Sequence, residues 1–131
     1  MQMIPLTHII FYLAMLFLPN GTAKFTVTSG SDQKITWVHQ AKGAWQATTE
    51  DGKDAGLWSA DGFVVTVTEH GNTSKTDVSQ FVRTVTTPEN KKMVAVLGKT
   101  ITVSNSASTI TFSKTEDGAS HKPLVISYSS Q

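Results

Sequence analysis

The chain has 131 residues and no cysteine, with 11 basic and 10 acidic side chains, so only 16% of it is charged. A net charge of +1 excludes the concentrated positive field that a general nucleic-acid surface needs. Without cysteine, neither a disulfide framework nor thiol catalysis is available. The fold must therefore be stabilised by packing alone, and the length fits one domain.

The first element is an uninterrupted apolar run over residues 9–18 (IIFYLAMLFL). It is too short to cross a bilayer, because a spanning helix needs roughly 20 apolar residues. It fits the apolar region of a secretory signal, and Pro19 and the small residues that end at Ala23 fit a cleavage site. Residues 1–8 contain no Lys or Arg, unlike most signals. We predict a signal peptide over 1–23 and a secreted or periplasmic protein with no stable membrane insertion after cleavage; the alternative is an uncleaved membrane anchor.

From residue 24 onward the sequence has the two-residue alternation of β-strands. Five times it repeats Thr, an aliphatic residue and Thr, which places an aliphatic side chain on one face of a strand and two hydroxyls on the other. Turn signals such as Asp-Gly separate these runs. The predicted strands are 24–29, 34–40, 44–49, 63–69, 80–86, 92–97, 99–104, 109–115 and 124–129, with 57–59 as an optional short strand.

The short connections predict that consecutive strands pair antiparallel. The expected fold is one all-β domain over 24–131, an antiparallel meander of about 8–10 short strands that forms a sandwich or a small barrel. Arg83 falls on the same predicted face as Phe81 and Val85, a local inconsistency. The predicted inward residues are Phe25, Val27, Ile35, Trp37, His39, Phe63, Val65, Val67, Phe81, Val85, Ile101, Val103, Ile110, Phe112, Leu124, Ile126 and Tyr128.

No reactive constellation is visible along the chain. His39, His70 and His121 are not spaced as zinc ligands, and His8 leaves with the signal. A Gly-x-Ser-x-Gly nucleophile elbow is absent, and the acidic residues mostly occupy turns instead of facing each other across a cleft. We predict a protein that is not an enzyme and that uses no metal or cofactor.

Three tryptophans, Trp37, Trp45 and Trp58, fall in the most turn-rich part of the chain. Neighbours on a strand point to opposite sides, so either Trp58 or Leu57 is expected at the surface. We predict Trp58, and secondarily Trp45, as binding residues at the loop-rich end around 41–62. The alternative is that all three rings fill the core. The expected function is a secreted, non-catalytic binding or interaction domain whose partner is a protein, a glycan or a small apolar ligand.

Two short motifs suggest a second function. Gly43-Ala44-Trp45 matches the Gly-x-Trp that opens the first barrel strand of lipocalin-like proteins, and Thr76-Asp77 resembles another short lipocalin motif. The resemblance is confined to these residues, and two predicted strands precede Gly43 where the family has none. It implies, as the alternative function, a carrier of a small apolar ligand in a lipocalin-like barrel.

One modification motif lies in the mature part of the chain. Asn72-Thr73-Ser74 fits the N-glycosylation acceptor pattern and follows a predicted hairpin turn at Gly71. We predict glycosylation at Asn72 if the source is eukaryotic.

Overall fold

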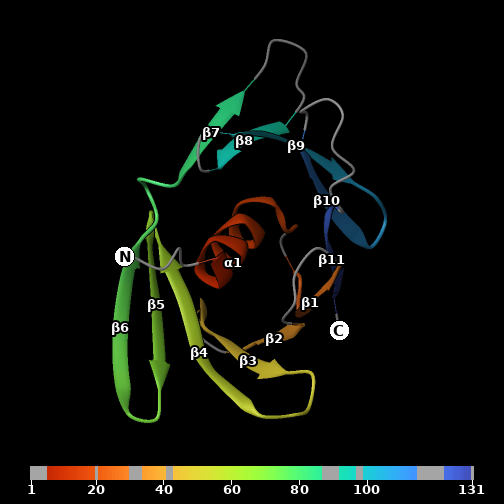
Figure 1. The fold of residues 1–131 in the computed structure, drawn as a ribbon. Helices are drawn as coiled ribbons and strands as arrows, with labels where there is room; N and C mark the ends of the chain where they lie inside the picture. The colour runs from red at the N-terminus through yellow and green to blue at the C-terminus, as the bar shows by residue number, and fades with distance from the viewer. Residues whose placement is uncertain are drawn as a thin grey trace.

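The computed structural model describes residues 6–19, 21–29, 34–40, 43–86, 92–96, 99–114 and 123–130. This part of the chain forms one helix and a single eleven-stranded sheet (Figure 1). The helix α1 spans Leu6–Phe17, and it is too short to cross a membrane. The strands are β1 (Lys24–Ser29), β2 (Ile35–His39), β3 (Trp45–Thr49), β4 (Asp54–Asp61), β5 (Val64–Glu69), β6 (Asn72–Asp77), β7 (Val82–Thr86), β8 (Lys92–Val96), β9 (Lys99–Asn105), β10 (Thr109–Lys114) and β11 (Leu124–Ser129).

The sheet is an antiparallel meander with the order β6-β5-β4-β3-β2-β1-β11-β10-β9-β8-β7. Strands β1 and β11 pair in its middle, so the two ends of the strand series meet there. The two edges, β6 and β7, follow each other in sequence but are not hydrogen-bonded neighbours in the described sheet. The sheet curls around α1 and stays open (Figure 1). The predicted all-β meander is confirmed, whereas the choice between sandwich and closed barrel is corrected to one open, curled sheet.

Most strand predictions agree with the structure to within two residues, and those for β1 and β11 coincide with it. Two differences stand out. The optional strand 57–59 is the centre of the longer β4, and β6 has no counterpart among the predicted strands. Strand β6 (NTSKTD) has no apolar side chain because both its faces are solvated, so it lacks the alternation that identifies a strand.

The predicted inward face is confirmed in β1, β2, β5 and β10 by residues such as Phe25, Trp37, Val65 and Ile110, each fully buried. Three positions need correction. His39 is exposed at the end of β2, Phe63 lies in the turn before β5 and is 47% exposed, and Phe81 is only half-buried before β7, where Val82 is the buried residue. The expected inward positions of Arg83 and Val85 lie outside the described side chains.

The convex face carries a row of hydroxyls that crosses five neighbouring strands, from β10 through β11, β1 and β2 to β3. Its members, opposed in register, are Thr109, Ser127, Thr26, Thr36 and Thr48. The Oγ1 atoms of Thr26 and Thr36 are 3.0 Å apart and share a hydrogen bond. Cross-strand hydroxyl pairs of this kind stabilise a sheet and fix its register.

Helix α1 lies at the centre of the curled sheet (Figure 1). Six consecutive residues, 9–14, are each 5% exposed or less, so the middle of the helix is buried on all sides. A helix that is apolar all round requires such an environment. The sequence predicts that residues 1–23 lie outside the domain, whereas in the uncleaved chain α1 is the middle of the core. Cleavage after Ala23 stays a prediction.

Candidate functional site

Four aromatic rings on adjacent strands line the concave face of the sheet. We call them the aromatic cradle: Phe25 on β1, Trp37 on β2, Trp45 on β3 and Trp58 on β4. The pairing register places Phe25 opposite Trp37 and Trp45 opposite Trp58, which brings the side chains to one face. The Phe25 and Trp37 rings stack at 4.9 Å, and Trp58 meets Trp37 edge-on at 5.6 Å. All four residues are 7% exposed or less.

In the uncleaved chain Trp58 is therefore not the surface residue of the Leu57–Trp58 pair, whereas a binding role for Trp58 and Trp45 stays a prediction. Trp58 is 5% exposed and its Nε1 donates to the carbonyl of Ala55 at 2.9 Å. Leu57 is the outward neighbour, 40% exposed. The structure brings the two predicted residues together in the cradle, where the alternative interpretation, with all three tryptophans in the core, places them.

Helix α1 covers the cradle with its own aromatic side chains. The Phe11 ring lies 5.4 Å from Trp58, 5.8 Å from Trp37 and 6.2 Å from Phe25. One turn earlier, the His8 ring lies 4.8 Å from Trp58, and burial of His8 lowers its pKa below the ordinary 6.5. The cradle is thus dry because the helix fills it.

One polar atom in this interface has no partner. Trp37 is fully buried, and its Nε1 makes no hydrogen bond. Leaving a buried donor unsatisfied costs about 1–3 kcal/mol. The described part of the core contains no buried polar or charged residue that could accept from it. Apart from its indole N–H groups, of which that of Trp37 has no partner, the buried part of the concave face is therefore hydrocarbon and aromatic.

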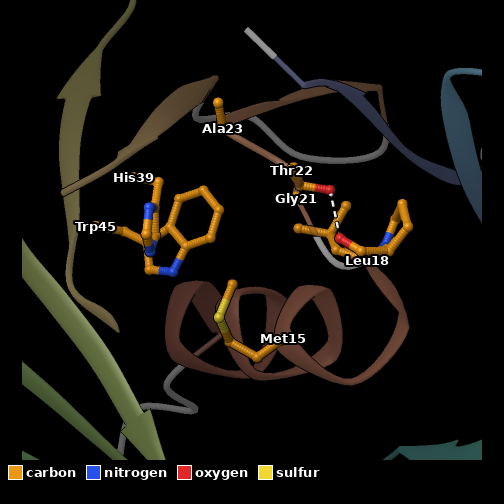
Figure 2. Close-up of a pocket in the computed structure, with 8 residues that line it drawn as sticks. Met15, Leu18, Gly21, Thr22, Ala23, His39 and Trp45 are labelled. Carbon is orange, nitrogen blue, oxygen red and sulfur yellow. Dashed lines mark hydrogen bonds between the residues drawn. The ribbon is translucent and has the colours of Figure 1, made fainter. Parts of the chain in front are cut away.

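A pocket of about 310 Å³ opens at the carboxyl end of α1. Figure 2 shows Trp45 and His39 on one side of it and Met15 of α1 on another. The Thr22 hydroxyl donates to the carbonyl of Pro19 at 2.8 Å. The exposed His39 ring packs edge-on against Trp45 at 4.9 Å. Because Trp45 belongs to both the pocket and the cradle, this is the end at which the cradle approaches the surface.

The predicted cleavage point lies beside the same pocket, inside the sheet. The Ala23 N–H donates to the carbonyl of Ser129, and the Ala23 carbonyl accepts from the N–H of His39, both at 2.8 Å. A peptidase binds its substrate as an extended, unpaired segment. Cleavage after Ala23 therefore has to precede the pairing of β1 with β2 and β11.

The remaining predicted residues lie apart from the cradle. Asn72 is exposed at the start of β6, and it follows His70 and Gly71, whose φ values of 53° and 81° form the predicted tight hairpin turn. Glycosylation there stays a prediction. Within the described ranges, no group of three or more His, Asp and Glu side chains could hold a metal ion. His121 lies outside the described residues.

Comparisons of the chain with models of protein families, with curated proteins and with solved structures found no match. The function is therefore inferred from the geometry of the site. Sequence reasoning missed the role of α1, because a uniformly apolar run is compatible with both a signal peptide and a fully buried helix. The feature of the sequence that could have indicated the cradle is the presence of one tryptophan, Trp37, Trp45 and Trp58, at an inward-facing position of each of three consecutive strands.

Proposed function

We propose that the exported protein, after loss of residues 1–23, is a carrier that holds an elongated apolar ligand where α1 lies in the uncleaved chain. The observation that supports this is the burial of the four cradle rings against a segment whose sequence has the character of a leader. Removal of that segment uncovers a concave aromatic surface. We expect a ligand to cover this surface, because monomeric proteins rarely expose large contiguous apolar patches.

The dimensions of the helix indicate the shape of the ligand. A helix of 12 residues is about 18 Å long and about 10 Å wide, so α1 fills on the order of 1,400 Å³. Ligand pockets usually measure roughly 300–1,000 Å³. The vacated space suits a long acyl chain or a pair of them, and the open seam between the edges β6 and β7 leaves the sheet room to contract around a thinner ligand.

The chemistry of the lining favours this carrier over a surface that binds a glycan or a protein. A glycan site needs a ring with polar side chains around it, but no polar side chain is buried around the cradle in the described core, and the indole N–H of Trp58 is already bonded within β4. The described core offers hydrocarbon and aromatic contacts. Their contribution to the free energy of binding increases with the apolar area removed from water. A carrier of a small apolar ligand was the alternative function predicted from the sequence. The proposal keeps that function but places the ligand in an open, curled sheet instead of a closed barrel.

The experiment uses the product that cells export when they express residues 1–131. We expect its intact mass to lack residues 1–23, and we expect it to bind N-phenylnaphthylamine saturably, with displacement by methyl palmitate. Trp58→Ala should weaken binding at least tenfold, since it removes a lining ring. Leu57→Ala, one residue away and outward-facing, should leave binding unchanged. An exported protein that retains residues 1–23, or a processed one that binds no apolar compound, would overturn the proposal.

A further inference from the structure

The unpartnered N–H of Trp37 specifies a chemical group on the ligand. We infer that the ligand carries an uncharged acceptor, the carbonyl of an acyl ester, which receives the Nε1–H of Trp37. This inference rests on the proposed function and adds to it the class of ligand.

The surroundings of Trp37 explain why α1 cannot satisfy this donor. The ring is stacked on Phe25 at 4.9 Å, lies 5.8 Å from the tilted ring of Phe11 of α1 and contacts Trp58 edge-on at 5.6 Å. The carbonyls in the middle of a helix already accept from the N–H four residues later, and the Phe11 side chain is hydrocarbon. Helix α1 therefore reproduces the apolar part of a ligand but supplies no acceptor at Trp37.

The polarity of the cradle restricts the acceptor to a neutral group. No charged side chain is buried in the described core, so a carboxylate beside Trp37 would be a buried anion with no counter-charge. An alcohol would bring its own O–H donor, and the described core contains no buried polar side chain to accept it. An ester carbonyl accepts without donating, and it interrupts an acyl chain without adding charge.

The test separates the hydrogen bond from the apolar contacts. Methyl palmitate and an alkane of equal length compete with N-phenylnaphthylamine for the processed, exported protein, as wild type and as Trp37→Phe. We expect the ratio of the affinity for the ester to the affinity for the alkane to fall by about 2–12-fold in Trp37→Phe. This factor corresponds to the usual contribution of a neutral hydrogen bond to the free energy of binding. Trp58→Phe is the matched control, because its N–H already donates to Ala55 and its loss should weaken both ligands equally.

A second measurement on the wild-type protein covers the case in which Trp37→Phe does not fold. The indole N–H resonance of Trp37 should move downfield when methyl palmitate is added and stay in place with the alkane. Equal loss of both ligands in Trp37→Phe, or an indole resonance that does not distinguish them, would overturn the ester assignment. If neither compound displaces the dye, the carrier function itself fails, which is a separate outcome.

Discussion

Replacing Phe11 with alanine in the uncleaved chain tests whether α1 is part of the core. The Phe11 side chain is fully buried and its ring lies 5.4–6.2 Å from Trp58, Trp37 and Phe25. Truncation of a buried phenylalanine costs about 3–5 kcal/mol, because it removes transfer free energy and leaves a cavity. For a domain of this size, the melting temperature should fall by roughly 10–20 °C. Urea and thermal unfolding of chain expressed without export, followed by tryptophan fluorescence, measure both quantities.

The same helix provides the control. Leu16 is 41% exposed, so Leu16→Ala should change the free energy of unfolding by no more than about 0.5 kcal/mol. Both variants shorten an apolar side chain on α1, and they differ in whether that side chain touches the cradle. If Phe11→Ala costs no more than Leu16→Ala, then α1 does not pack on the cradle and the proposed ligand space does not exist.

Two further predictions concern stability. Gly56 has φ +100°, and a Cβ added there would lie 3.0 Å from a methyl carbon of Val67, so Gly56→Ala should lower the free energy of unfolding by about 2–3 kcal/mol. Gly52 has φ +88° but open space around it, so Gly52→Ala should lower it by about 1 kcal/mol. Equal losses of the two variants in urea unfolding would contradict the close contact at Gly56. In the uncleaved chain, burial lowers the pKa of His8, so the unfolded state binds more protons and the free energy of unfolding should fall as the pH drops below about 6.5, with a shallower fall in His8→Gln. Parallel pH profiles for the two proteins would show that His8 is solvated.

The sequence predicts those parts of the fold that depend on local alternation. Strands β1 and β11 coincide with their predicted ranges because Phe25, Val27 and Ile126 alternate with hydroxyl residues. Strand β6 escapes prediction because it is polar on both faces. The hydroxyl row and the curl of the sheet depend on pairing between distant strands, such as β1 with β11, which spacing along the chain does not encode.

The candidate site was harder to predict for a related reason. Sequence alternation shows that Trp58 and Leu57 face opposite ways, but not which of them faces inward. The pairing of β3 with β4 is irregular between Gln46 and Thr48. The alternation of inward and outward residues in β3 therefore cannot be extended through the turn to decide which residues of β4 face inward. The sequence identifies the residues of the cradle, whereas its burial depends on α1, a segment that the sequence predicts to leave.

We propose that the cradle needs an apolar occupant, which is α1 before processing and a ligand after it. Native mass spectrometry of the protein recovered from the export compartment tests whether this occupant exists. We expect the mass of residues 24–131 together with a bound organic molecule that is released on denaturation. A processed chain that melts cooperatively and carries no bound molecule would contradict the claim.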